Sequence, residues 1–437
     1  MRAALFAVCL AGAAGAGEVP QSLSDADFSS HDPEEVRLGQ LLFYDPILSG
    51  NREVSCATCH HPRFATGDGL SLGIGDGGKG LGPERIADPD NPPEQRIPRN
   101  APPLFNLGHG DVTVLFADGR IERDATRPSG FRTPLEEEMV NGFAGLLSAQ
   151  TMFPVLSPDE MAGHYQENEI SKAVRQGRLT GEGGAWDLIA ALIRAIPAYQ
   201  ERFESVYPEI EDGRPLDFTD ISNAIAAFMA EEWRSEDSAF DRHLRGEATL
   251  TGPAAEGMEL FYGEAGCVAC HSGPLLSDFG FHVMGAPQLG PGKAERFETH
   301  QRDLGRFRVT GREADRYAFR TPMLRNVTRT GPWGHAGGHA DLRAFLRDHM
   351  APRAGLDADM RDVVLPPLDG IAPDWAVMDS GSDREDIRAA IPIPDRVASE
   401  AELTALLAFL TALEDPVALS GRLGIPDAVP SGLPVDR

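Results

Sequence analysis

The sequence contains two copies of one five-residue pattern, Cys56-Ala57-Thr58-Cys59-His60 and Cys267-Val268-Ala269-Cys270-His271. A C-x-x-C-H pattern is the attachment site of a c-type haem, in which both thiols form thioethers and the histidine ligates the iron. The two patterns therefore predict two covalently bound haem c groups. His60 is the expected axial ligand of the first iron, and His271 is that of the second.

A paired C-x-x-C zinc site is the main alternative. Such sites bring their two cysteine pairs within ~15–20 residues of each other. Here Cys59 and Cys267 are 208 positions apart. The histidine that closes each pattern also favours haem over zinc.

Residues 1–16 have the features of a secretory signal peptide. Arg2 precedes a short apolar run, and Ala14-Gly15-Ala16 is a small-residue cleavage pattern. Cys9 lies in this stretch, so the mature chain would keep only the four cysteines of the two motifs. We therefore expect an exported, periplasmic protein in which all of the remaining thiols bind haem.

The composition limits the possible partners. The 437 residues include 67 acidic and 40 basic groups, which give a formal net charge of -27. Nucleic acid is not expected as a partner, because phosphate binding requires a positive field. No segment after residue 16 approaches ~18 consecutive apolar residues, so no membrane span is expected. A basic or neutral protein partner fits the charge better.

One stretch of the second half is rich in arginine. Guanidinium groups suit bidentate pairing with carboxylates, so this stretch is expected to contact the haem propionates. A biased coding composition explains the arginine excess equally well. The residues are Arg302, Arg306, Arg308, Arg312, Arg316, Arg320, Arg325 and Arg329.

The hydrophobic periodicity predicts an all-α protein with long loops. The helix expected at residues 33–44 precedes the first haem motif, and the helix expected at 253–261 precedes the second, so the architecture repeats. Thr219 is the expected N-cap of the helix at 219–233. Residues 63–134 and 351–398, which are rich in Gly, Pro or Asp, are expected to form loops. Further helices are expected at 186–195, 197–206 and 399–413, and from Asp341.

Five segments resemble the bacterial diheme cytochrome c peroxidases and their relative MauG. The resemblance runs from about residue 33 to 350, and the order and spacing of the segments agree with both haem motifs. The segments are Leu38-Gly39-Gln40-Leu41-Leu42-Phe43-Tyr44-Asp45, Arg99-Asn100-Ala101-Pro102, Phe116-Ala117-Asp118-Gly119-Arg120, Phe279-Gly280-Phe281-His282 and Tyr317-Ala318-Phe319-Arg320-Thr321-Pro322-Met323-Leu324-Arg325-Asn326-Val327.

The resemblance implies two cytochrome c-like haem domains with a calcium ion between them. The domain at 25–240 would carry the peroxidatic haem, and the domain at 241–437 would carry a haem that stores or relays electrons. Asn100, through its side chain, and Thr330 and Pro332, through their backbone oxygens, fall at the family's calcium positions. Oxygen donors are what calcium requires, although each residue could instead serve as a cap or in a turn.

The resemblance also places the sixth ligand of the second iron. The family's methionine or tyrosine lies fourteen residues after a histidine that matches His335, and His349 stands at that position. His349 also shares the apolar face of the helix that starts at Asp341. Met350 is the alternative ligand, but it lies about 100° around the helix from that face. A bis-histidine second haem is therefore expected.

The first haem departs from the peroxidases in two ways. Asp76 stands where peroxidases that need reductive activation have an extra histidine, so the first iron should be open from the start. The family's distal glutamate aligns with Ser148 or Ala149, after an insertion at about 122–145. Proton transfer still needs an acid or base in reach. The candidates are Glu160, Glu138 and Gln150, each of which could equally be a solvated surface group.

The position of the family's interhaem tryptophan corresponds to Phe105. An aromatic relay would therefore use Trp333 or Trp375 instead.

These features predict a periplasmic diheme peroxidase-like oxidoreductase. It would take hydrogen peroxide at the His60 haem, store two oxidising equivalents across both haems, and oxidise aromatic side chains of a partner protein, as MauG does. The first alternative is peroxide removal as a cytochrome c peroxidase, fed by a small cytochrome or cupredoxin. The second is a non-enzymatic diheme electron carrier, which would require both irons to be six-coordinate.

Overall fold

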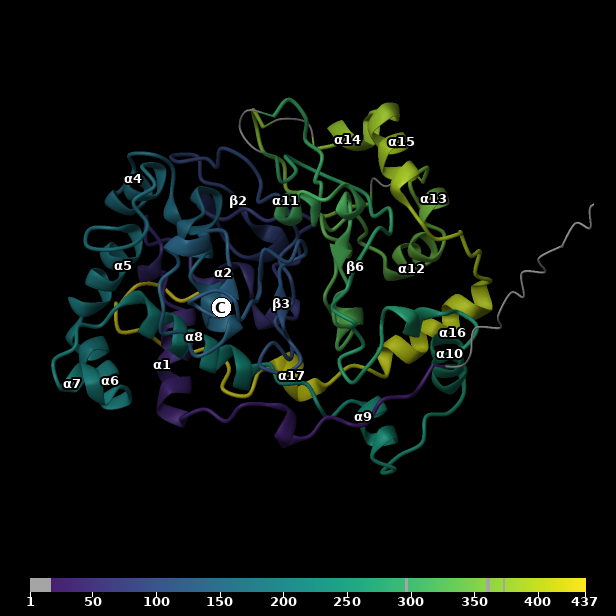
Figure 1. Ribbon diagram of the computed structural model, residues 1–437, viewed down its shortest axis with the longest axis horizontal. Coiled ribbons are helices and arrows are strands. Elements are labelled where there is room, and N and C mark those ends of the chain that lie inside the picture. The colour runs from purple at the N-terminus through teal and green to yellow at the C-terminus, as the bar shows by residue number, and fades with distance from the viewer. Residues whose placement is uncertain (1–16, 295–297, 359–361, 372–373) are drawn as a thin grey trace, which may run out of the picture.

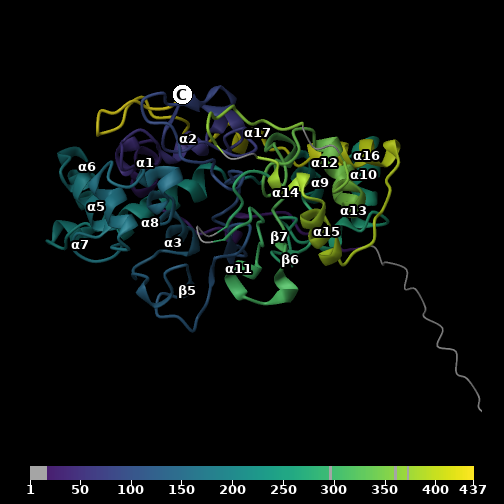
Figure 2. The same cartoon turned by 90° about the horizontal axis from the view of Figure 1, so that it is seen from above.

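Two pairs of packed helices organise the computed structural model, one pair beside each haem motif (Figure 1). The structure describes residues 17–294, 298–358, 362–371 and 374–437. In the first half α1 (Pro33–Phe43) packs against α8 (Phe218–Glu232). In the second half α10 (Pro253–Tyr262) packs against α16 (Glu400–Thr411). The two halves lie side by side, which both views show (Figures 1 and 2).

A glycine allows the close approach of the helices in each pair. A Cβ atom added to Gly39 would lie 1.8 Å from the carbonyl oxygen of Ala224 on α8. A Cβ atom added to Gly257 would lie 1.9 Å from the carbonyl oxygen of Ala405 on α16. Each glycine is followed three residues later by the sequence Leu-Phe-Tyr. The repeat expected from the sequence is therefore also a repeat of helix packing.

We expect Gly39→Ala and Gly257→Ala to lower the free energy of unfolding by about 1–3 kcal/mol each, because the added methyl group overpacks the helix contact. Gly381→Ala is the control, since nothing lies within 4 Å of a Cβ atom added there. Thermal unfolding of the haem-loaded variants measures the effect. If both Gly39→Ala and Gly257→Ala unfold at the same temperature as the wild type, the close approach of the helices is contradicted.

The remaining helices have ten residues or fewer, and the strands have two or three. The helices are α2 (Cys56–Cys59), α3 (Leu146–Thr151), α4 (Glu169–Arg175), α5 (Ala185–Arg194), α6 (Pro197–Val206), α7 (Pro208–Glu211), α9 (Ala239–Leu244), α11 (Phe307–Thr310), α12 (Leu342–Met350), α13 (Pro352–Gly355), α14 (Ala376–Asp379), α15 (Gly381–Ala390) and α17 (Pro416–Ser420). Three small antiparallel sheets are formed by β1 (Gly78–Lys79) with β2 (Ile86–Ala87), by β3 (Val114–Leu115), β4 (Ile121–Arg123) and β5 (Phe131–Arg132), and by β6 (Phe281–His282) with β7 (Phe319–Arg320).

The mostly helical fold confirms the expected class, and the expected helices begin and end within two residues of the observed ones. Two local expectations were wrong. Asp217, rather than Thr219, caps α8, because its carboxylate accepts hydrogen bonds from the backbone N–H groups of Thr219 and Asp220. The stretch 351–398, which was expected to form loops, contains the ten-residue helix α15.

The two described ends of the chain cross between the halves (Figure 1). The backbone N–H of Gly17 donates to the carbonyl oxygen of Tyr262, 2.7 Å away in the second half. The C-terminal segment returns to the first half, where the hydroxyl of Thr58 donates to Asp436 at 2.6 Å and Val429 joins the core. Residues 421–437 thus pack on the first half, although the expected division assigns them to the second domain.

The expected signal peptide, residues 1–16, lies outside the described residues. Among the described helices, none combines the length and apolar character that a membrane crossing requires.

Candidate functional site

One cavity of about 670 Å³ contains both haem motifs in its wall. Cys56, Cys59 and His60 line it from the first half, and the second motif lines it from the other half through Cys267, Cys270 and His271. All four cysteines are free of disulfide bonds. The cavity therefore offers the thiols and histidines that two haem c groups need at two separate places.

Each motif histidine has one ring nitrogen fixed by the backbone. His60 Nδ1 lies 2.9 Å from the carbonyl oxygen of Thr66, and His271 Nδ1 lies 3.1 Å from that of Leu276. A carbonyl partner requires Nδ1 to carry the proton, which leaves Nε2 free to ligate iron. Burial lowers the pKa of both histidines, so the neutral form that binds metal is favoured. Both residues fit the role of proximal haem ligand.

His349 faces His271 across the cavity. Their ring centroids are 6.3 Å apart, with an interplanar angle of 55°. Two imidazoles on opposite sides of one metal have ring centres about 6 Å apart, because each metal–nitrogen bond is about 2 Å long. Phe345 stacks on His349 at 5.4 Å and orients its ring. Burial lowers the pKa of His349 to about 4, which keeps the imidazole neutral.

Met350 was the alternative to His349 as ligand. Its side chain joins the second hydrophobic core together with Leu346, and it also lines the cavity. The ring geometry of His349 and His271 supports the histidine, and the assignment of the ligand stays a prediction.

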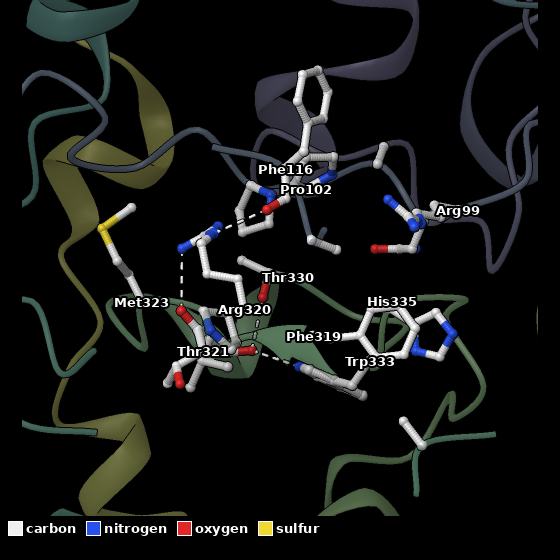
Figure 3. Close-up of a pocket in the computed structure, with 18 of the residues that line it drawn as sticks. Arg99, Pro102, Phe116, Phe319, Arg320, Thr321, Met323, Thr330, Trp333 and His335 are labelled. Atoms are coloured by element: carbon white, nitrogen blue, oxygen red, sulfur yellow. Dashed lines mark hydrogen bonds between the residues drawn. The ribbon is translucent and has the colours of Figure 1, made fainter. Parts of the chain in front are cut away.

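Arg320 is suited to form an ion pair with a haem propionate. It lines the cavity and donates to the carbonyl oxygens of Phe116 and Thr321 at 3.1 Å each, as Figure 3 shows. In the described part of the chain, no carboxylate forms an ion pair with it, and burial lowers its pKa to about 10. A buried cation without a counter-charge is costly. A haem propionate would supply the missing negative charge.

His335 also presents unsatisfied polar atoms to the cavity. Both of its ring nitrogens are buried without a hydrogen-bond partner, and its ring stacks on Phe319 with centroids 3.8 Å apart (Figure 3). Buried polar atoms without partners mark a place where a ligand or water is expected. Arg320 and His335 together fit the polar edge of a haem.

The other arginines of the stretch pair with protein carboxylates. The guanidinium of Arg325 lies 2.7 Å from Asp241, and both side chains are fully buried. Arg306 lies 2.7 Å from Glu122 and so joins the two halves. The partners of the others are Asp386 for Arg302 and Arg316, Glu298 for Arg308, Asp315 for Arg312 and Glu414 for Arg329. Arg320 is therefore the member of this stretch that lines the cavity without a described carboxylate partner, and its contact with a haem propionate stays a prediction.

Arg99 holds the cavity wall together across the two halves. It forms a bidentate pair with Asp303 at 2.7 and 2.9 Å, and it lies 2.7 Å from Asp118. Both carboxylates are buried, and the guanidinium lowers the pKa of each. Well-formed bidentate pairs fix geometry, so the halves have a defined relative position at the cavity.

The three residues expected at the calcium site lie in the wall of the same cavity. Asn100, Thr330 and Pro332 all line the cavity. The side-chain N–H of Asn100 donates to the carbonyl oxygen of Leu70 at 2.7 Å. No described residue donates to the side-chain oxygen of Asn100, so this atom is available to a cation. Calcium binding here remains a prediction.

If calcium binds at this place, Asn100→Ala should lose one calcium ion per chain, because it removes the only side-chain oxygen of the expected ligand set. Elemental analysis after dialysis at limiting calcium measures the loss. Asn141→Ala, at an exposed position, is the control. Equal calcium content in both variants would contradict the site.

Two of the three candidate distal residues reach the cavity. Gln150, on α3, and Glu160, in the short π-helix Pro158–Ala162, line it together with His60. Glu138 is exposed and does not line the cavity. Burial raises the pKa of Glu160. Ser148, where the distal glutamate was expected to align, instead donates to Asn223 at 2.5 Å and contacts Ser222.

Asp76 faces away from the cavity. Its carboxylate accepts hydrogen bonds from Asn51 Nδ2 at 3.1 and 3.2 Å, and it is not among the lining residues. Its backbone N–H donates to the carbonyl oxygen of Glu160 at 3.0 Å. Asp76 therefore lies behind the segment that carries Glu160, which supports an open first iron.

One of the two candidate relay tryptophans, Trp333, lines the cavity, as does Phe105 at the position of the family's tryptophan. The indole N–H of Trp333 donates to the carbonyl oxygen of Val327 at 2.8 Å. Trp375 packs instead against the hydrophobic cluster of Leu72 and Leu289. Trp333 is thus better placed than Trp375 for a relay.

A mostly helical chain with two C-x-x-C-H motifs in one cavity defines a diheme c-type cytochrome. A family model described as di-haem cytochrome c peroxidase matches residues 33–249. The methylamine utilization protein MauG of Methylorubrum extorquens is 32% identical over 76% of this chain and 72% of its own length. The cytochrome c551 peroxidase of Nitrosomonas europaea is 30% identical over 76% and 77%. The chain belongs to the di-haem cytochrome c peroxidase family, which includes MauG.

The fold also matches solved structures of this family. A MauG-like protein associated with microbial copper homeostasis matches with a TM-score of 0.55 and 26% identity, over 95% of this chain and 97% of its own. The diheme peroxidase BthA of Burkholderia thailandensis matches with a TM-score of 0.56 over 93% and 91%, and at 21% identity it supports the fold alone. The family and its enzymatic class, as inferred from the sequence, are confirmed.

Proposed function

We propose that this enzyme uses hydrogen peroxide at the His60 haem to oxidise aromatic side chains of a partner protein, in the manner of MauG. The observation that carries the proposal is His349 opposite His271. Imidazole in place of a thioether ligand lowers haem potential, and axial ligands span a range of ~0.8 V. A bis-histidine second haem is a poor electron store at high potential and is better suited to sharing oxidising equivalents.

Glu160 would move the proton in the first half of the reaction. The haem irons supply the redox chemistry when they are bound. A carboxylate oxygen of Glu160 takes the proton of the incoming peroxide and returns it to the departing oxygen. Gln150 lines the same wall, and its side-chain N–H would donate a hydrogen bond to peroxide. Both roles require an open first iron, which is supported by the position of Asp76 outside the cavity wall.

The expected partner is a protein in the periplasm. The charge of -27 favours a partner with a basic or neutral surface. Trp333, in the cavity wall, is the proposed relay for electrons between the haems.

Peroxide removal is the second candidate function. It is favoured by the relative named cytochrome c551 peroxidase, whose identity to this chain is within two points of that of MauG. A small cytochrome or cupredoxin would then supply the electrons. The electron-carrier reading is not favoured, because the chain belongs to a family of enzymes and because Glu160 and Gln150 line the cavity beside His60.

Peroxide treatment of the ferric enzyme without added reductant tests the choice. Proteins encoded beside this chain are incubated with it and then analysed by mass spectrometry for oxidised tryptophan and tyrosine. Oxidation that requires the wild-type enzyme and disappears with Glu160→Gln supports the MauG-like function. Unaltered aromatic residues in every candidate, together with peroxide turnover driven by a reduced small cytochrome, would contradict it in favour of peroxide removal.

A further inference from the structure

A second cluster of metal-ligating side chains lies outside the haem cavity. Asp76, His164 and Glu167 each place a ligand atom within 4.8 Å of the others. Asp76 is fully buried and His164 is 8% exposed, while Glu167 closes the cluster from the surface. One imidazole nitrogen and two carboxylates form a donor set that suits Zn²⁺ or Mn²⁺.

The two carboxylates lack a permanently charged partner. Asn51 Nδ2 donates to Asp76 at 3.1 Å and to Glu167 at 2.8 Å. His164 Nδ1 lies 3.5 Å from Glu167, and His164 Nε2 accepts a hydrogen bond of 3.4 Å from the backbone N–H of Glu94, so an ion bound through His164 displaces one of these two contacts. Among the described residues, no lysine or arginine forms an ion pair with either carboxylate, and burial with the nearby Glu167 raises the pKa of Asp76 to about 6. Asp76 is the costly member of the pair, because a buried carboxylate with only an amide donor lacks a counter-charge. Glu167 is exposed, and despite its partial burial the hydrogen bonds from Asn51 and from the backbone N–H of His164 lower its pKa.

We infer that Asp76, His164 and Glu167 bind one divalent transition-metal ion of the Zn²⁺ or Mn²⁺ class. In this site the ion, rather than the side-chain amide of Asn51, bridges the two carboxylates. This site is separate from the calcium site expected at Asn100, because none of its three residues lines the haem cavity.

The ion would fix the backbone behind Glu160. The backbone N–H of Asp76 donates to the carbonyl oxygen of Glu160 at 3.0 Å, and His164 follows Glu160 by four residues. A Cβ atom added to Gly75 would lie 2.6 Å from the same carbonyl oxygen, so the two segments are in close contact. This positioning role rests on the proposed function of Glu160, whereas ion binding itself does not.

The experiment uses the haem-loaded full chain, stripped of other metals by a chelator and then supplied with excess calcium to fill the expected calcium site. ZnCl₂ and, separately, MnCl₂ are titrated by calorimetry, and bound metal is counted by elemental analysis. Wild type should bind one ion that Asp76→Asn and Glu167→Gln do not bind. Asp111→Asn is the control, because Asp111 lies 3.9 Å from His109 and is exposed, outside the cluster. It should retain the ion.

Equal metal content in wild type and both cluster variants, or no ion bound by wild type, would overturn the inference. Glu167 lies at the surface, so Glu167→Gln gives the result even if Asp76→Asn fails to fold. Peroxide turnover separates the two claims. If peroxide turnover is unchanged when the ion is lost, the ion does not position Glu160, but the ion site itself stands. If Glu160→Gln keeps full turnover, the proposed role of Glu160 is wrong, and the count of bound ions is unaffected.

Discussion

Glu160→Gln is expected to slow the reaction of the ferric enzyme with hydrogen peroxide by about 10²–10⁴-fold, the usual contribution of a positioned acid–base group. The amide keeps the size of the side chain but cannot take the peroxide proton. Stopped-flow absorbance of the haem bands measures the rate. Because burial raises the pKa of Glu160 above its usual value of 4.5, the wild-type rate should fall as pH drops through this raised pKa, where the carboxyl becomes protonated.

Glu138→Gln is the matched control, since Glu138 is an exposed glutamate near the cavity segment in sequence but absent from the cavity wall. It should react at the wild-type rate. A Glu160→Gln variant that keeps both the rate and its pH profile would show that another group moves the proton.

His349→Met is expected to raise the reduction potential of the second haem substantially within the ~0.8 V range that axial ligands span, because a thioether stabilises the reduced iron relative to imidazole. The variant should behave more like an activatable peroxidase and should lose oxidation of a partner protein that occurs without added reductant. Spectroelectrochemical titration of both haems measures the change.

Met350→Leu tests the alternative ligand with a residue of similar volume. Met350 packs in the second core, so the substitution should leave the potential unchanged. A shift of the second potential in Met350→Leu, with none in His349→Met, would assign the methionine as ligand instead.

The sequence predicted the parts of the site that depend on short fixed spacings. The two C-x-x-C-H motifs and the helix positions follow from local chemistry and periodicity, and the structure agrees with them. The position of His349 was predicted from the resemblance, fourteen residues after His335, and from the helical spacing that puts it on the apolar face with Leu342. The helix packing at Gly39 and Gly257 repeats because the same short pattern recurs before each motif.

The distal side of the first haem could not be chosen from the sequence. Its residues come from a short α-helix and a short π-helix that follow an insertion, and which of them face the cavity depends on contacts with α8 and with the loop at Asp76. Glu138 ends a run of three glutamates and Glu160 follows Asp159, so both lie in acidic stretches of the sequence, and only the fold separates the residue that lines the cavity from the exposed one. The crossing of the chain ends likewise depends on distant contacts such as Thr58 with Asp436.

The most direct test of the account is the electron paramagnetic resonance spectrum of the untreated ferric protein. One iron held by His60 alone from the protein and one held by both His271 and His349 should give a high-spin signal together with a low-spin signal, in equal amounts. Two low-spin signals would mean that the first iron also carries a sixth protein ligand, and the proposed peroxide chemistry at that haem would be wrong.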